Sequence, residues 1–395
     1  MVTVYPVETT LYNPEMCYNG YTLLCFPANP RPVQLIDMNG NVVNEWRLQT
    51  ARARLLENGN IIMVLPPQAF LDEAQAKVSK TSDLDITKAS NRIQEYSWEH
   101  ELIWEYIPPG NAHHDVQRLD NGNTLLLYME VVPEEYKKKI ENLKRRRDIC
   151  IYSDVVLELT PDKEIVWEWH EYKYLDINQY CQICNLADWT HTNTVQALPE
   201  NKWYDAGDKR FKPGNILLSL RNLSVIFVVD RESKEVVWTY TGDYNGGLAG
   251  QHEPHMIEKG LPGEGNILIF DNGAPPLKNL RHSGQSYVLE INPVSKNLVW
   301  RYENGEKFFS KFRSNIQRLP NGNTLICESE GPRIFEVTSE EEIVWEYAVP
   351  YQLIIGRAYR YPYDYCPQLR ALDKPKEEMV SSPPHVSTKP IALRI

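Results

Sequence analysis

The chain has 395 residues, of which 42% are apolar, and a formal net charge of -11. No run of 18 apolar residues occurs, which argues against a membrane-spanning helix. The negative charge argues against a nucleic-acid groove, which needs clustered Lys and Arg, and favours small molecules as partners. The first twenty residues, MVTVYPVETTLYNPEMCYNG, contain neither a basic nor an apolar leader region, so we expect a cytoplasmic protein.

A short unit recurs along the chain: an apolar stretch, a turn that usually contains Gly, and a second apolar stretch. Its copies are ARARLLENGNIIMV, HHDVQRLDNGNTLLL, NTVQALPENK with PGNILLSL after it, HEPHMIEKGLPGEGNILIF and SNIQRLPNGNTLICES. Asn-Gly between two β-rich runs is a strong hairpin signal, because both residues tolerate the positive φ of a two-residue turn. Each copy is therefore predicted to be a pair of antiparallel strands.

A second unit follows each hairpin and ends in a tryptophan, as in DVVLELTPDKEIVWEW and SVIFVVDRESKEVVWTY. The segment PVQLIDMNGNVVNEW near the N-terminus has the same form. The closing tryptophans are Trp46, Trp104, Trp167, Trp238, Trp300 and Trp345. Large aromatic side chains dominate buried interfaces, so we assign these six to packing between the repeated units and give them no chemical role.

Four strands per unit, repeated six times, predict an all-β fold: a six-bladed β-propeller with four-stranded antiparallel blades and a short helical insertion. Residues 1–366 would form this single domain, with blades at about 11–48, 51–106, 111–170, 189–240, 250–303 and 312–347. The Pro, Ser and Lys content of 367–395 is typical of a surface-hugging or disordered tail. How the ring closes stays open, including whether 351–366 adds a strand to the first blade.

Two insertions interrupt the repeat, each after the second strand of a blade. Residues 67–91 are polar, and residues 133–147 are predicted to form a short basic helix with a solvated face. The seven cysteines are odd in number and scattered, which favours reduced thiols over a disulfide framework. Cys181 and Cys184 form a single CxxC without the further soft ligands of a tetrahedral zinc site, so we favour an ordinary loop.

The tight turns within blades must lie on one face of the ring, and the long, variable connections must share the opposite face, where function concentrates. Aligning the first strands by their turns gives one register at the start of each strand, occupied by His114, Asn193, His252 and Ser314. The side chains expected to meet at one mouth on the long-connection face are His114, His191, Asn193, Arg221 and His252.

The fold does not itself require histidine at this register, because the second and sixth blades carry Ala51 and Ser314 there. Several imidazoles and a guanidinium, with no acidic partner in register, form an anion-stabilising cluster. An imidazole nitrogen can also act as a nucleophile or as a general acid. We therefore expect an oxyanion such as sulfate, carboxylate or phosphate as the guest. The absence of a glycine-rich phosphate-binding loop weakens the hypothesis that the ligand is a nucleotide.

The segments HHDVQRLDNGN, DWTHTNTV, SLRNLS, the QH before the fifth blade and GLPGEGNILIFDNG together resemble the arylsulfotransferase family. The resemblance covers about residues 11–366. It implies a six-bladed propeller that transfers a sulfuryl group from a phenolic sulfate to an acceptor phenol without a nucleotide donor or other cofactor, so the substrate would be aromatic and anionic.

Residue roles follow from the same resemblance. It implies that His252 is the nucleophile that becomes transiently sulfated and that His114 assists at the phenolic oxygen. His191, Asn193 and Arg221 would bind the sulfuryl oxygens. His113 and His255 are neighbours that we assign to substrate binding.

Two other functions stay open at this stage. Imidazoles converging on a propeller axis can hold a divalent metal such as iron or zinc, and the candidate ligands are His114, His191, His252 and either His113 or His255. Arg221 in the same mouth argues against a cation there. The other alternative is a propeller that binds a partner without catalysis. The oligomeric state is not predicted.

Overall fold

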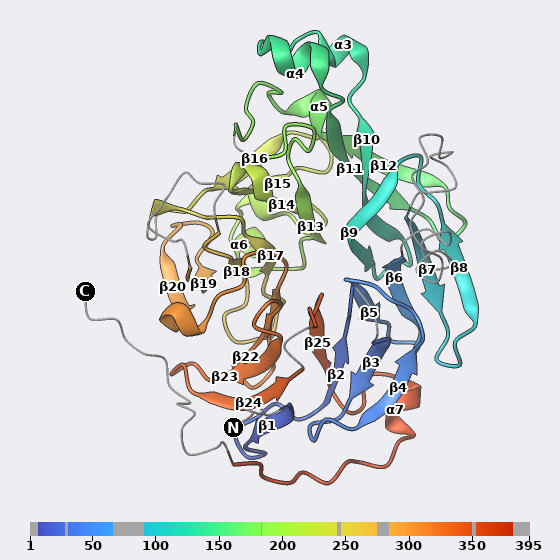
Figure 1. The fold of residues 1–395 in the computed structure, drawn as a ribbon, viewed down its shortest axis with the longest axis vertical. Coiled ribbons are helices and arrows are strands. Elements are labelled where there is room, and N and C mark those ends of the chain that lie inside the picture. Colours follow the sequence, from blue (N-terminus) through green and yellow to red (C-terminus); the bar gives the residue numbers. More distant parts are fainter. Residues whose placement is uncertain are drawn as a thin grey trace, which may run out of the picture.

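The structure is a computed structural model that describes residues 7–27, 31–65, 91–182, 184–242, 246–274, 284–349 and 353–381. Six antiparallel sheets stand around a central axis as the blades of a β-propeller (Figure 1), which confirms the predicted fold class. The polar insertion predicted at 67–91 falls almost wholly outside the described residues, as does the tail beyond residue 381. No helix in the described part of the chain is long and apolar enough to cross a membrane.

The strands of the first three blades run from the axis outward. The first blade contains β25 (Ala358–Tyr361), β2 (Tyr21–Leu24), β3 (Val33–Ile36) and β4 (Val42–Trp46). The second contains β5 (Ala53–Leu55), β6 (Ile61–Leu65), β7 (Arg92–Tyr96) and β8 (Leu102–Tyr106). The third contains β9 (Asn111–Arg118), β10 (Thr124–Val131), β11 (Tyr152–Leu159) and β12 (Ile165–His170).

The other three blades repeat this order. The fourth blade contains β13 (Thr192–Ala197), β14 (Ile216–Leu220), β15 (Val225–Val229) and β16 (Val236–Tyr240). The fifth contains β17 (His252–Met256), β18 (Ile267–Asp271), β19 (Tyr287–Ile291) and β20 (Leu298–Tyr302). The sixth contains β21 (Asn315–Arg318), β22 (Thr324–Glu328), β23 (Arg333–Val337), β24 (Ile343–Ala348) and, outermost, β1 (Glu8–Tyr12).

The two ends of the chain close the ring. Strand β25 supplies the inner strand of the first blade by pairing antiparallel with β2, which answers the question that the sequence left open. Strand β1 pairs with β24, so the N-terminal residues belong to the sixth blade. The first blade predicted at 11–48 is wrong at its start, because the outer edge of the sixth blade offers β1 a free hydrogen-bonding edge.

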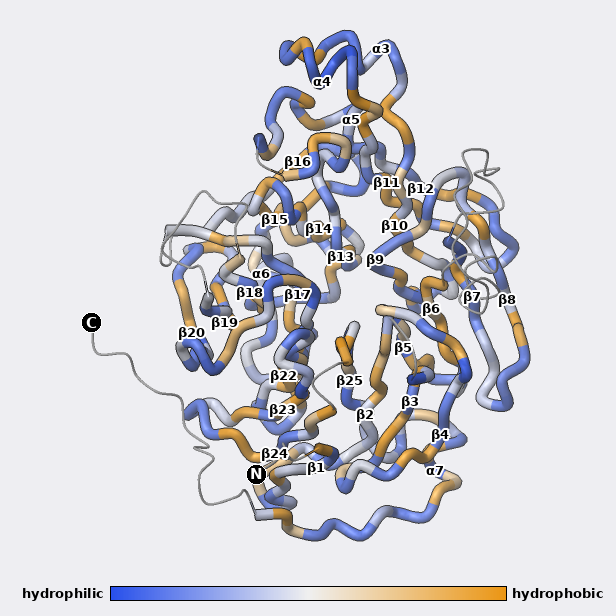
Figure 2. The backbone as a smooth tube through the Cα atoms, in the orientation of Figure 1, coloured by the Kyte–Doolittle hydropathy of each residue, from blue (hydrophilic) through white to orange (hydrophobic). Residues whose placement is uncertain are grey.

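Six apolar clusters of the described residues each lie between two adjacent blades, and a seventh, which includes Ile140 and Trp189, packs at the insertion of the third blade. Figure 2 shows apolar residues concentrated along the strands and polar residues along the connections. For example, Ile62 of the second blade packs in one cluster with Leu126 and Val155 of the third blade. A blade therefore buries its faces only against its neighbours, as expected for a repeat architecture.

The closing tryptophans link each blade to the next. The indole N–H of Trp46 donates to the carbonyl of Ser97 at 3.0 Å, and that of Trp238 donates to the carbonyl of Pro293 at 2.8 Å. The same contact, from the outer strand of one blade to the outer turn of the next, occurs at every closing tryptophan: Trp46, Trp104, Trp167, Trp238, Trp300 and Trp345. Packing between blades thus comes with a hydrogen bond from the closing tryptophan at each interface.

Five short helices decorate the described part of the propeller: α3 (Glu134–Lys137), α4 (Leu143–Asp148), α5 (Glu171–Tyr174), α6 (Lys202–Asp205) and α7 (Pro367–Arg370). The basic insertion at 133–147 follows the second strand of its blade as predicted, but it forms two helices, α3 and α4, instead of one. Residues 371–381 run over the surface after α7 (Figure 1), where Val380 pairs with Tyr12.

One cysteine pair departs from the prediction of reduced thiols. Cys181 and Cys184 form a disulfide, because the local turn brings their Cα atoms to 5.3 Å, within bonding range. The other five cysteines are free.

Candidate active site

Three consecutive inner strands bring histidines to the ring face that carries the long connections. His113 and His114 lie in β9, His191 directly precedes β13, and His252 is the first residue of β17. His114 and His191 have positive φ values of 52° and 54°, and the pairing of each of these strands contains a bulge. A bulge changes the direction of a side chain, and a positive φ is strained for histidine. Both features cluster at functional sites. We call these four residues the histidine mouth.

The imidazoles of the mouth contact one another. Nδ1 of His113 lies 2.9 Å from Nδ1 of His114. The rings of His114 and His191 meet edge to face, with centroids 4.7 Å apart. Nδ1 of His191 lies 2.5 Å from Oδ2 of Asp188. Burial, followed by the charges of the neighbouring imidazoles, lowers the pKa of His114 well below its usual range, so its ring is neutral at pH 7.

Two buried acids lie behind His113. Oδ1 of Asp154, in β11, lies 3.0 Å from Nε2 of His113. The Thr190 hydroxyl donates its hydrogen bond to Asp154 at 2.7 Å, and its oxygen also contacts the carboxyl group of Glu171 of α5. Burial and the charge of Asp154 raise the pKa of Glu171 well above its usual range. Burial alone would also raise the pKa of Asp154, but the contact with His113 and hydrogen bonds from Thr190 and the Thr192 N–H lower it. The pair therefore holds one negative charge, on Asp154.

This charge fixes the proton positions in the mouth. The carboxylate of Asp154 favours a proton on Nε2 of His113, which leaves Nδ1 of His113 as an acceptor. Nδ1 of His114 must then donate to it across the 2.9 Å contact. The remaining nitrogen of His114, Nε2, keeps its lone pair, so His114 is arranged to accept a proton.

Sequence reasoning missed the acidic partners. No acid shares the histidine register, as predicted, but Asp154 and Glu171 come from β11 and α5, which only the folded blade brings behind β9. Asp188 gave a signal, because it stands three residues before His191 in the DWTH segment. The expectation of a cluster without acids therefore holds for the strand register and fails for the site.

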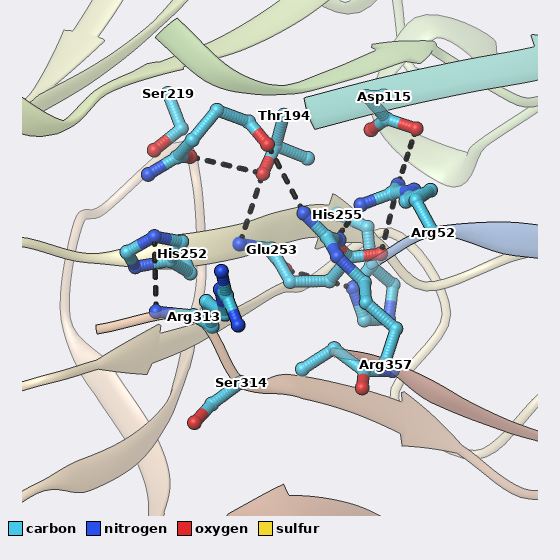
Figure 3. A network of polar contacts seen from close by, with 12 residues as sticks. Arg52, Asp115, Thr194, Ser219, His252, Glu253, His255, Arg313, Ser314 and Arg357 are labelled. Carbon is cyan, nitrogen blue, oxygen red and sulfur yellow. Dashed lines mark hydrogen bonds and ion pairs between the residues drawn. The ribbon is translucent and has the colours of Figure 1, made fainter. Parts of the chain in front are cut away.

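His252 is held by the residues around it. Its Nδ1 lies 2.7 Å from Oδ1 of Asn272 and 3.0 Å from the carbonyl of Gly250, so this nitrogen carries the proton. Asn272 is itself fixed, because its amide donates to the carbonyl of Ser310 at 2.8 Å. Nε2 of His252 accepts a long hydrogen bond of 3.3 Å from the Arg313 N–H (Figure 3). The lone pair of His252 therefore lies on Nε2.

Arg221 provides positive charge beside His252. It starts a short 3-10 turn (Arg221–Leu223) after β14, and its N–H donates to the His191 carbonyl at 3.3 Å. Burial and the charges of Arg221 and His191 lower the pKa of His252 to about 3, although its hydrogen bond to Asn272 acts in the opposite direction. His252 is therefore unprotonated at neutral pH and competent as a nucleophile.

Asn193 does not face the mouth. It is fully buried in the bulge of β13, and its side-chain amide donates to the carbonyl of Gln251 at 2.8 Å. Its own carbonyl accepts from Arg357 at 3.1 Å. The structure places Asn193 in the wall between β13 and β17, because the bulge shifts the register that was counted from the turn.

His255 is separated from the histidine mouth by four buried charged residues on the axis (Figure 3), which we call the axial plug: Arg52, Asp115, Glu253 and Arg357. Nδ1 of His255 donates to the carbonyl of Glu253 at 3.1 Å, and its ring lines a different cavity. His255 therefore lies three residues beyond His252 along β17 but on the other side of the plug. It does not share the mouth with His113, contrary to the grouping from sequence.

Two adjacent cavities form the mouth, of about 250 Å³ and about 300 Å³, and both are lined by His113 and His114. His252 lines the first cavity and His191 the second. Such volumes suit a small aromatic ligand. Among the described residues, no group of three or more His, Cys, Asp or Glu side chains has the geometry to hold a metal ion. The alternative ligand set with His255 is also divided by the plug.

Solved structures are similar to this chain at low sequence identity. A protein of unknown function from Bacteroides caccae is 13% identical, with a TM-score of 0.52 over 86% of this chain and 98% of that chain. A catalytically inactive variant of virginiamycin B lyase from Staphylococcus aureus with quinupristin is 9% identical, with a TM-score of 0.42 over 87% of this chain and 88% of that chain. None of the curated protein sequences matches.

The fold and the site together define a six-bladed β-propeller whose long-connection face carries neutral imidazoles beside a guanidinium. The sequence profile described as arylsulfotransferase (ASST) matches residues 84–349, more than half of the chain, a range that contains the histidine mouth and Arg221. This protein belongs to the arylsulfotransferase family.

Proposed function

We propose that this protein transfers a sulfuryl group from a phenolic sulfate to an acceptor phenol through a sulfated His252, without a metal or nucleotide cofactor. The observation that carries the proposal is the arrangement around His252. Asn272 and Gly250 hold its proton on Nδ1, burial keeps the ring neutral, and the residue lines the cavity that it shares with His114. Family membership supports the reaction class.

In the first half-reaction, Nε2 of His252 attacks the sulfur of the bound aryl sulfate. A bond forms between nitrogen and sulfur as the bond between sulfur and the aryl oxygen breaks. The aryloxide leaves with its electron pair and takes a proton from solvent. The sulfur must replace the 3.3 Å contact from the Arg313 N–H, which costs no more than an ordinary hydrogen bond, about 1 kcal/mol.

In the second half-reaction, the acceptor phenol gives its proton to Nε2 of His114 as its oxygen attacks the sulfur. The bond between His252 and sulfur breaks, and Nε2 of His252 regains its lone pair. His114 then releases the proton to solvent. The low pKa of His114, caused by burial and neighbouring charge, keeps the ring unprotonated and ready for this step.

Arg221 and His191 would stabilise the sulfuryl oxygens, on which negative charge is spread in the transition state. Fixed donors of this kind are each worth about 3 kcal/mol, by analogy with oxyanion holes. Asp188 orients His191 through the 2.5 Å contact at Nδ1, so the opposite nitrogen is directed away from the acid. We assign Asn193 the positioning of β13 against β17, since its side chain does not reach the mouth.

The test combines turnover with detection of the intermediate. Purified protein is mixed with 4-nitrophenyl sulfate and phenol, and release of 4-nitrophenol is followed by absorbance. Without an acceptor, peptide mass spectrometry should find one added sulfuryl group on the peptide that contains His252. Turnover without this adduct in any trapping experiment would exclude the covalent route. Absence of turnover with a panel of aryl sulfates would overturn the proposed activity.

A further inference from the structure

A second cavity lies on the axis, on the turn-bearing side of the axial plug. We call it the lower cavity; its volume is about 150 Å³. Every inner strand contributes to its lining, with Arg54, Gln117, Gln196, His255, Gln317 and Tyr359 among the lining residues. It shares no lining residue with the cavities of the histidine mouth. The lower cavity is therefore a separate compartment, and what it holds does not depend on the proposed function.

The charges between the two compartments do not balance. The guanidinium groups of Arg52, Arg54 and Arg357 share only two carboxylates, those of Asp115 and Glu253. Arg52 and Arg357 hold the close contacts. Arg54 lies 3.8 Å from Asp115 and 3.5 Å from Glu253, so it is the least well paired of the three. The Arg54 side chain is 28% exposed, so its incompletely paired charge leaves a place for one more anion beside it.

Hydrogen-bond donors at the cavity also lack partners. In the part of the chain that the structure describes, the buried Nε groups of Arg54 and Arg318 have no hydrogen-bond acceptor. Arg318 lines the lower cavity and is paired with Glu290 through its Nη2 at 2.6 Å. The Arg54 guanidinium lies over the ring of Tyr359, 4.8 Å from its centroid, which holds it in place. Unsatisfied guanidinium N–H groups are suited to a planar or tetrahedral oxyanion.

The lowered pKa of His255 is consistent with the same positive field. Burial, followed by the charges of Arg54, Arg318 and Arg52, lowers the pKa of His255 to about 3. The one further acid on the cavity wall, Glu258, is exposed, so solvent screens it. A cavity that repels a proton from an imidazole in this way is electrostatically favourable for an anion.

We propose that the lower cavity binds one small oxyanion, a sulfate or a short carboxylate, between the guanidinium groups of Arg54 and Arg318. Because Arg54 lies on β5 and Arg318 lies on β21, the bound anion would link the second blade to the sixth. The site would therefore stabilise the closed propeller, apart from any anion bound at the histidine mouth.

The test titrates sodium sulfate and, separately, sodium acetate against sodium chloride at equal ionic strength, and follows binding by calorimetry and unfolding by differential scanning fluorimetry. In the wild type we expect saturable stabilisation of about 2 °C or more. The anion with the lower dissociation constant identifies the preferred chemistry. Stabilisation by neither anion beyond chloride would overturn the proposal.

Variants assign the site. Arg54→Gln should weaken this stabilisation at least tenfold in anion concentration, since charge-assisted hydrogen bonds are lost. Arg54→Lys should keep part of it. Arg47→Gln, which changes an arginine that is 88% exposed, is the matched control and should behave as the wild type. An unchanged response in Arg54→Gln would place the anion elsewhere, for example at Arg221, and contradict the proposal.

A second measurement does not depend on a folded variant. Crystals of the wild type soaked in selenate should show anomalous density between Arg54 and Arg318. Density only at the histidine mouth, or none, would overturn the lower site and leave the proposed function untouched. Loss of sulfuryl transfer together with selenate density at Arg54 would overturn the proposed function and leave the lower site untouched.

Discussion

The outermost and innermost strands of the six blades differ in how closely their residues follow the sequence repeat. Each blade carries a tryptophan at the equivalent outer position, and each indole N–H makes the same contact with the next blade. The inner strands present different residues at the mouth, from Ala51 to His114 to His252. A residue that repeats around the ring performs the same packing in each blade, whereas departures from the repeat gather where the chemistry is asymmetric.

The largest effect is expected at a departure from the repeat. His252→Ala should reduce turnover of 4-nitrophenyl sulfate by about 10⁴-fold or more, because a nucleophile is lost. Its melting temperature should fall by only a few degrees, because the variant loses the hydrogen bonds of the ring to Asn272 and Gly250. His100→Asn is the matched control, because His100 is exposed on an outer turn. Full turnover in His252→Ala would remove His252 from catalysis and weaken the contrast between inner and outer strands.

Trp238 tests the packing role of the outer positions that repeat in every blade. Trp238→Ala should destabilise the protein by about 3 to 5 kcal/mol in urea unfolding, because a buried aromatic side chain leaves a cavity. Trp238→Phe keeps most of the packing and loses the bond to Pro293, so it should cost less, about 1 to 2 kcal/mol. The turnover of folded protein should stay within about twofold in both variants. A selective loss of turnover at full stability would contradict a purely structural role.

Asp154 sharpens the comparison, because it contacts the histidine mouth from β11, the third strand of its blade counted from the axis. Asp154→Asn keeps the shape but removes the charge that fixes the proton positions in His113 and His114. We expect kcat to fall about 100-fold with KM nearly unchanged, and the pH profile to shift. Asp162→Asn, in the exposed outer turn of the same blade, is the control. An equal loss in both variants, or a change in KM alone, would contradict the positioning role.

The smallest effect is expected from making the inner strands more alike. Gln occupies the position of His255 in three other blades, as Gln117, Gln196 and Gln317. His255→Gln should therefore fold, and its turnover should stay within about twofold, because the axial plug separates it from the mouth. A large loss of turnover would show that the plug does not isolate the two compartments.

The same variant should change the acid dependence of stability. The folded pKa of His255 is about 3, below the ordinary value of 6.5, so between these values the unfolded chain binds the extra proton. Stability therefore falls as the pH decreases from 6.5 towards 3, by up to about 1.4 kcal/mol per pH unit for this group. His255→Gln should flatten that fall in urea unfolding measured at several pH values. An unchanged slope would show that His255 is protonated in the folded protein.

The blades and much of the mouth could be predicted because their signals are local. The Asn-Gly turns and the closing tryptophans recur at regular intervals, and counting from the turns places His252 correctly at the start of its strand. His114 instead is the fourth residue of β9, because that strand begins earlier than the count predicts. Counting failed at Asn193, where a bulge turns the side chain into the wall. It also failed at His255, because nothing local indicates that a charged plug lies between His252 and His255.

The sequence by itself determined the repeat, the number of blades, the tryptophan positions and the candidate histidines, since each depends on residues that are close along the chain. Only the tertiary structure decided that β25 closes the ring, that β1 joins the sixth blade, and that Asp154 and Glu171 stand behind His113. The same holds for the lower cavity at Arg54. These features depend on contacts between residues far apart in the chain, whose geometry is set by packing six blades around one axis.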